Sequence, residues 1–125
     1  MFNIFNRLAQ EQRNGLRSDY ERVMNALTEA DDVCQVCVGH MINTTNTLFF
    51  HKFGSIDNFQ KLSKHEKYDY LNSLTKFEEN FHQKKQVEGL GVALFKMWVG
   101  AIVADDRELY EEFSQGLIFL SKKAP

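Results

Sequence analysis

Residues 87–104 read VEGLGVALFKMWVGAIVA and are apolar almost all round when wound into a helix. A helix that is hydrophobic on every side lies either at the centre of a globular domain or across a membrane. The part from Leu90 to Ala104 contains Lys96 and is shorter than the about 20 apolar residues that a membrane-spanning helix needs. The segment therefore predicts a central buried helix, and its small residues predict close packing with neighbouring helices.

Helix signals flank this segment on both sides. Ser63 and Glu66 have the spacing of a capping box, which predicts that a polar-rich helix begins there. Asp105 and Asp106 predict the start of a last helix, because carboxylates at a helix start accept free backbone N–H groups and oppose the helix dipole. The one proline is Pro125, so no proline interrupts these helices.

The N-terminal part of the sequence predicts two helices with a boundary between them. Gly15 lies where the apolar periodicity lapses, so residues 1–14 are expected to form a short, loosely docked N-terminal helix. Its apolar residues recur at a three-residue spacing, as Phe2, Phe5 and Leu8. A second capping-box pattern, Ser18 with Glu21, predicts that the next helix begins there and continues to about Ala30.

A further helix is expected in the middle of the chain. Asp31 and Asp32 predict its start, and apolar residues at three- and four-residue intervals carry it toward His51. Gly54 is expected to end it. Residues 55–62 predict a turn that contains one or two helical turns.

These segments together predict an all-α fold, a single compact domain over residues 1–125 in which five to six mostly antiparallel helices surround the central helix at about 87–104. The length of 125 residues and a 43% hydrophobic share are enough for one hydrophobic core. The gaps between helices are short, which favours antiparallel neighbours. A globin-like crossing of the helices is the alternative arrangement.

The near balance of positive and negative residues limits the kinds of partner that the chain is expected to bind. Fifteen Lys and Arg residues nearly offset 17 Asp and Glu residues, and the formal net charge is −2. This composition argues against a disordered tail and against a surface for nucleic acid or membrane. The first eight residues do not resemble a secretory signal, so we expect a cytoplasmic location.

Cys34 and Cys37 form a C-x-x-C motif, which can hold a reactive disulfide or half of a metal site. The predicted helix start at Asp31 and Asp32 places both cysteines inside a helix, and these carboxylates would raise a thiol pKa. A zinc site would need further ligands, and the sequence has no second C-x-x-C motif. We therefore expect reduced thiols that pack in the core, as free cysteines commonly do.

Two other groups of polar residues contain side chains that can bind metal ions. Glu79 and His82 form one E-x-x-H motif, whereas di-iron bundles use two such motifs. Glu108, Glu111 and Glu112 form the densest acidic cluster, and a metal-dependent hydrolase that uses them is the third functional hypothesis. The sequence favours a solvated helix surface for both groups, and we expect no catalytic residues, no metal and no cofactor.

The aromatic content carries the leading functional hypothesis. The chain has 11 phenylalanines, and adjacent helical residues such as Phe49 and Phe50 point about 100° apart, so both cannot fill one core face. We expect a non-enzymatic intracellular module, regulatory or immunity-like, that binds a protein partner or forms a homodimer. The candidate anchors are Phe49, Phe50, Phe53 and Trp98.

The alternative hypothesis is a helical pocket for a small apolar ligand or a cofactor such as haem or a lipid. Its candidate residues are His51, Phe95, Met97 and Trp98. Visible absorption or a co-purifying lipid would favour this alternative over the interaction module.

Overall fold

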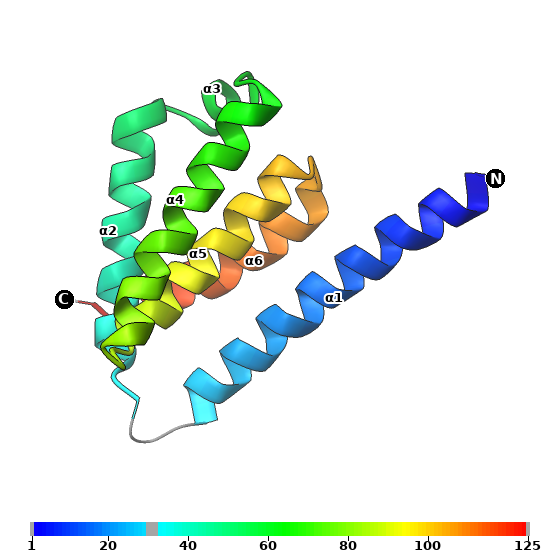
Figure 1. Cartoon of the computed structure of the whole chain (residues 1–125). Coiled ribbons are helices and arrows are strands. Elements are labelled where there is room, and N and C mark those ends of the chain that lie inside the picture. Colours follow the sequence, from blue (N-terminus) through cyan, green and yellow to red (C-terminus); the bar gives the residue numbers. More distant parts are fainter. Residues whose placement is uncertain (1, 30–32, 125) are drawn as a thin grey trace.

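The computed structural model of the chain describes residues 2–29 and 33–124, and within these ranges the side chains from residue 13 onward. Its described part is a bundle of six helices with no strand, and the chain is 84% helical (Figure 1). The helices are α1 (Phe2–Glu29), α2 (Gln35–Phe53), α3 (Ile56–Gln60), α4 (Lys64–Gln83), α5 (Glu88–Val103) and α6 (Arg107–Ser121). The predicted all-α fold class is confirmed.

The central helix is α5, within one residue of the segment that the sequence predicts. It packs against α2, α4 and α6 and also contacts α1 and α3. Nine of its 16 residues are buried. Most sides of α5 meet a neighbouring helix. This central position explains why residues 87–104 are apolar almost all round.

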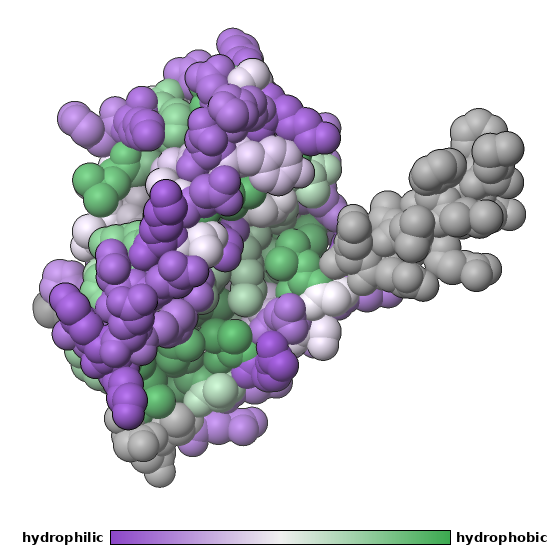
Figure 2. Space-filling model, in the orientation of Figure 1, coloured by the Kyte–Doolittle hydropathy of each residue, from purple (hydrophilic) through white to green (hydrophobic). Residues whose placement is uncertain are grey.

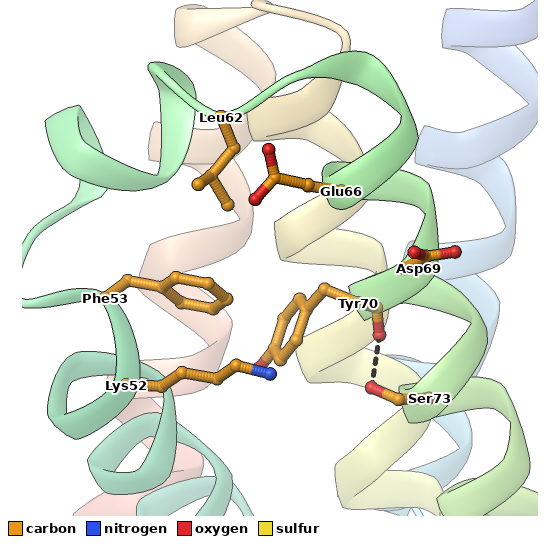
Figure 3. A pocket seen from close by; sticks show the side chains of 7 residues that line it. All are labelled: Lys52, Phe53, Leu62, Glu66, Asp69, Tyr70 and Ser73. Atoms are coloured by element: carbon orange, nitrogen blue, oxygen red, sulfur yellow. Dashed lines mark hydrogen bonds between the residues drawn. The ribbon is translucent and has the colours of Figure 1, made fainter.

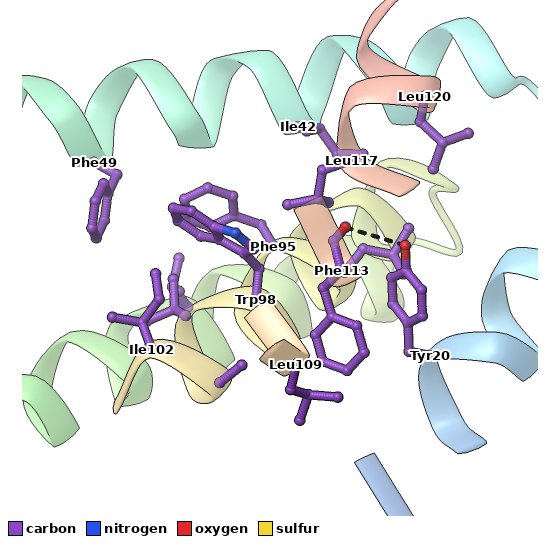
Figure 4. Close-up of a cluster of buried hydrophobic side chains, with 14 of the residues drawn as sticks. Tyr20, Ile42, Phe49, Phe95, Trp98, Ile102, Leu109, Phe113, Leu117 and Leu120 are labelled. Carbon is purple, nitrogen blue, oxygen red and sulfur yellow. Dashed lines mark hydrogen bonds between the residues drawn. The ribbon is translucent and has the colours of Figure 1, made fainter. Parts of the chain in front are cut away.

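The core is rich in aromatic rings, and Figure 4 shows how side chains from α1, α2, α5 and α6 converge in it. Phe49 of α2 is fully buried, and its ring centroid lies 5.9 Å from that of Phe95 and 5.7 Å from that of Trp98. Most of these ring pairs meet edge to face or tilted, which is the arrangement that aromatic quadrupoles favour. The indole nitrogen of Trp98 donates a hydrogen bond to Ser114 Oγ at 2.8 Å, so its polar atom is satisfied.

Glycines permit the closest helix contacts. A Cβ atom added to Gly91 of α5 would lie 2.8 Å from the carbonyl oxygen of Val38 in α2. A Cβ atom added to Gly39 of α2 would overlap the carbonyl group of Leu120 in α6. The backbones of these helices therefore approach more closely than any larger residue would allow.

Several predicted helix ends are confirmed. The Ser63 hydroxyl accepts a hydrogen bond from the backbone N–H of Glu66 at 3.1 Å, and the Glu66 side chain completes the capping box at the start of α4. The Asp106 carboxylate caps α6 by accepting the N–H of Leu109 at 3.0 Å. Gly54 ends α2 with a positive φ of 84°, a conformation that costs glycine little.

The predicted boundary at Gly15 and the predicted helix start at Ser18 are wrong. Helix α1 is continuous from Phe2 to Glu29, so both residues lie inside it. A glycine within a helix costs only about 1 kcal/mol relative to alanine, and packing of α1 offsets that cost. The expected stripe of Phe2, Phe5 and Leu8 has a helical backbone, and its side chains lie outside the described residues.

Helix α1 runs parallel to α6 and is held along it by polar and aromatic contacts. Arg13 Nε lies 2.6 Å from Asp106 Oδ2, at the first turn of α6. Arg17 Nε lies 2.8 Å from Glu112 Oε2, about one and a half turns further along α6. Tyr20 follows, and its ring stacks on Phe113 with 4.3 Å between centroids.

The N-terminal end of α1 extends beyond the bundle, as Figure 1 shows. With 28 residues α1 is about 42 Å long at 1.5 Å per residue, whereas α5 with 16 residues is about 24 Å long. Arg13 already meets the start of α6, so residues 2–12 lie past the end of that helix.

None of the described helices combines the length and the hydropathy that crossing a lipid bilayer requires.

Candidate functional site

A groove lies between α1 and α4, with α5 as its floor. Its volume is about 380 Å³. The groove is lined by Leu16 of α1, by Leu71 and Glu78 of α4, and by Ala93, Lys96, Met97 and Gly100 of α5. Figure 2 shows hydrophobic surface in the hollow between α4 and α1. The groove is thus a largely apolar channel bordered by two helices.

The floor of the groove consists of small or flexible residues. Ala93, Met97 and Gly100 recur at three- and four-residue spacing, so they share one face of α5. A Cβ atom added to Gly100 would have no heavy atom within 4 Å, which marks open space above this residue. This strip of α5 is half-buried and lines the groove.

The four candidate anchors of the leading hypothesis lie in different environments. Phe49 is fully buried and Trp98 is 5% exposed, so both belong to the core of the chain itself. Phe50 is 36% exposed and Phe53 is half-buried. The reasoning that Phe49 and Phe50 face different ways agrees with this arrangement, and Phe50 is the one of the pair that reaches the surface.

Phe53 lies in a small pocket between the end of α2 and the start of α4, shown in Figure 3. The pocket has a volume of about 260 Å³, and Leu62, Glu66, Asp69 and Ser73 also line it. The ammonium group of Lys52 lies 5.4 Å from the ring centroid of Phe53 and 5.8 Å from that of Tyr70. These cation–π contacts give Lys52 a partner within the chain.

The candidate residues of the ligand-pocket hypothesis do not converge on one cavity. Phe95 and Trp98 are buried in the core, and His51 is exposed near the end of α2. Met97 faces the groove between α1 and α4. The proposed haem or lipid site therefore stays a prediction without a cavity that joins its residues.

The acidic cluster of α6 is engaged with arginines. Glu108 Oε2 lies 3.0 Å from Arg13 Nη2, and Glu111 Oε1 lies 3.0 Å from Arg107 Nε. Glu112 pairs with Arg17, as described above. Two of the three carboxylates thus hold α1 on α6. Among the described residues no three His, Cys, Asp or Glu side chains lie close enough together to bind a metal ion.

The predictions for the two cysteines are wrong. A disulfide joins Cys34 and Cys37, where reduced thiols were expected. Helix α2 begins at Gln35, four residues later than Asp31, so Cys34 is the N-cap residue and is exposed. Cys37 lies in the first turn and is half-buried, so neither residue packs in the core. Asp31 and Asp32 lie outside the described residues.

The groove is not among the sites predicted from the sequence, although the small residues of α5 are a feature that points to it. The small residues of α5 were interpreted as surfaces for neighbouring helices, and Gly39 and Gly91 show that such contacts do occur. Ala93 and Gly100 belong to the same segment but line the groove. Where α1 docks decides which small residues stay uncovered, and the sequence does not reveal that position.

Comparison of this chain with protein-family models, with curated proteins and with solved structures finds no match.

Proposed function

We propose that this chain is a helical protein–protein interaction module that functions as a homodimer. The N-terminal part of α1 from one copy lies in the groove between α1 and α4 of the other copy. The observation that carries the proposal is the pairing of an uncovered apolar groove with a long helix end that extends past the same bundle.

The form of the groove and the sequence of the extended segment fit each other. The groove is bordered by two helices, and its floor contains the small residues Ala93 and Gly100 beside Met97, a form that accepts an amphipathic helix. The segment of residues 2–12 is helical, and the sequence repeats Phe2, Phe5 and Leu8 at the three-residue spacing of an apolar face. Burial of such residues against the groove removes apolar surface of both partners from water.

A twofold arrangement uses both features at once. Leu16 lies on the same helix as the extended segment and lines the groove. If the α1 helices of two copies pair antiparallel about their residue 9, the Phe2 end of each copy lies beside Leu16 of the other. Two identical groove contacts then form about one symmetry axis, as in most homodimers.

Light scattering during size-exclusion chromatography tests this proposal. The wild-type chain is expected at twice 14.6 kDa. Gly100→Leu fills the groove where the structure has free space, and Phe5→Glu places a charge on the inserted segment. Both variants are expected to elute as folded monomers, with unchanged helical circular dichroism.

Ile118→Gln is the matched control. Ile118 is an exposed apolar residue of α6 that lies outside the groove, so this variant is expected to stay dimeric. A monomeric wild-type chain, or dimers in both Gly100→Leu and Phe5→Glu, would overturn the proposal. A wild-type monomer that carries the added mass of a small molecule would instead support the ligand-pocket hypothesis.

A further inference from the structure

The disulfide between Cys34 and Cys37 lies at the surface, at the N-terminus of α2. Cys34 is exposed, whereas Cys37 is half-buried in the first helical turn. The Sγ atom of Cys34 accepts a hydrogen bond from the backbone N–H of Cys37 at 3.2 Å. A thiol in solution can therefore reach one sulfur of the pair more easily than the other.

The sulfur of Cys34 also lies at the N-terminal end of α2. Free backbone N–H groups and the positive end of the helix dipole stabilise negative charge at a helix start. The thiolate is the species that reacts in thiol–disulfide exchange. The Sγ atom of Cys34 lies at this end of α2, because it accepts the backbone N–H of Cys37 in the first turn.

The start of α2 is held in place independently of the disulfide. The side-chain amide of Gln35 donates a hydrogen bond to the carbonyl oxygen of Leu27 at 2.6 Å, which ties α2 to α1. Val38, one residue after Cys37, is fully buried between α2 and α5. The two cysteines are thus carried on a backbone that other contacts position, so the S–S bond can open while α2 stays docked.

We propose that Cys34 and Cys37 form a reversible thiol–disulfide exchange site whose co-reactant is a thiol. A thiolate of the co-reactant attacks Sγ of Cys34 and forms a mixed disulfide with it. The bond between Cys34 and Cys37 breaks, and its electron pair stays on Sγ of Cys37. A second thiolate then attacks the co-reactant sulfur of the mixed disulfide and releases Cys34.

The net reaction balances two electrons and two protons. Two co-reactant thiols are oxidised to one disulfide, and the protein disulfide is reduced to two thiols, which take up the two protons. In the reverse direction Cys34 attacks and Cys37 resolves the mixed disulfide. Val36, between the two cysteines, is 43% exposed and gives a thiol-bearing partner an apolar contact beside the reacting sulfur.

Single-cysteine variants of the full chain test which sulfur reacts. Cys37→Ser leaves Cys34 alone, and Cys34→Ser leaves Cys37 alone with a serine that can still cap α2. Each variant is incubated with oxidised glutathione, and the mixed disulfide is followed by intact mass. We expect Cys37→Ser to react at least about tenfold faster than Cys34→Ser, because the sulfur of Cys34 belongs to an exposed residue beside the N–H groups of the first turn of α2, whereas Cys37 is half-buried. Equal rates, or a faster Cys34→Ser, would overturn the proposal.

Reduction of the wild-type disulfide tests reversibility and distinguishes two sources of thiol. One arm uses reduced glutathione and the other uses reduced thioredoxin as a protein dithiol, both without denaturant. Reaction in either arm, with helical circular dichroism retained, supports the proposal, and the faster arm identifies the kind of thiol. A disulfide that opens in neither arm until urea unfolds the chain would be purely structural and would overturn it.

Discussion

The hydroxyl group of Tyr20 in α1 occupies the space that a Cβ atom on Gly116 of α6 would need. The same hydroxyl donates a hydrogen bond to the carbonyl oxygen of Phe113 at 3.2 Å (Figure 4). The absence of a side chain at residue 116 therefore lets the tyrosine lie flat against α6. This contact sets the distance between α1 and the bundle, and α1 forms one wall of the proposed interaction groove.

Replacing this glycine is expected to displace α1. Gly116→Ala places a methyl group on the Tyr20 hydroxyl, and overpacking of this kind costs about 1–3 kcal/mol of unfolding free energy. Gly15→Ala is the matched control, because Gly15 lies outside the groove lining, its Cβ would have no neighbouring atom within 4 Å, and alanine favours a helix by about 0.5–1 kcal/mol. Urea denaturation measures the unfolding free energy of both variants. Equal effects of the two substitutions would contradict the described packing of α1.

The adjacent phenylalanines of α2 are expected to differ strongly. Phe49 is fully buried among aromatic rings, and its replacement by alanine is expected to cost about 3–5 kcal/mol. Phe50 is 36% exposed, so Phe50→Ala is expected to cost about 1 kcal/mol. Thermal and urea unfolding of the two variants compares them. A larger loss for Phe50→Ala than for Phe49→Ala would show that α2 is rotated from its described orientation.

The structure also separates a true helix cap from a false one. Ser63→Ala removes the capping box of α4 and is expected to destabilise the fold by about 1 kcal/mol. Ser18 has the same sequence signature but lies inside α1, so Ser18→Ala is expected to leave stability within about 0.5 kcal/mol. Urea denaturation of Ser63→Ala and Ser18→Ala measures the two changes in unfolding free energy. A loss at residue 18 as large as that at residue 63 would argue for a helix start at Ser18.

Some helix positions in this chain can be predicted from local sequence patterns, and others cannot. The apolar segment 87–104 and the Ser63–Glu66 pair are local patterns, and each lies where the sequence predicts. The Ser18 signature is equally local, but α1 passes through it because Leu16 and Tyr20 pack on the bundle. A capping motif predicts a helix start only where the chain also leaves the helix before it, and that depends on tertiary contacts.

The candidate sites depended on contacts that the sequence does not contain. The groove exists because α1 docks beside α6 and leaves Ala93 and Gly100 uncovered. The disulfide was missed because the predicted helix start lay four residues before the observed one at Gln35. That shift moves Cys34 from a helix interior to an exposed N-cap position, which reverses the expected chemistry of the motif.

Alkaline pH is expected to destabilise the fold through Tyr70. Burial raises the pKa of Tyr70 from 10.0 to about 12. Above pH 10 the unfolded chain therefore releases this proton while the folded chain keeps it, so stability is complete below pH 10 and is lost as the pH rises toward 12. Burial also raises the pKa of Tyr20, so Tyr70 accounts for only part of the loss.

The pH dependence of the urea midpoint measures this effect. Tyr70→Phe removes the titrating hydroxyl and is expected to make the decline above pH 10 shallower. Tyr68→Phe is the control on the same helix, because Tyr68 is 46% exposed, and it is expected to keep the wild-type slope. An unchanged slope in Tyr70→Phe would show that another group causes the alkaline loss.

Cross-linking between two differently substituted copies tests the proposed dimer most directly. In a background with Cys34→Ser and Cys37→Ser, one copy carries Phe2→Cys and the other carries Leu16→Cys, because the proposed pairing places these two residues side by side, and the two copies are mixed and oxidised. The account predicts a covalent dimer that contains one chain of each kind, formed faster than dimers of either variant alone. Failure of this mixed dimer to form between folded chains would contradict insertion of α1 into the groove of a second copy.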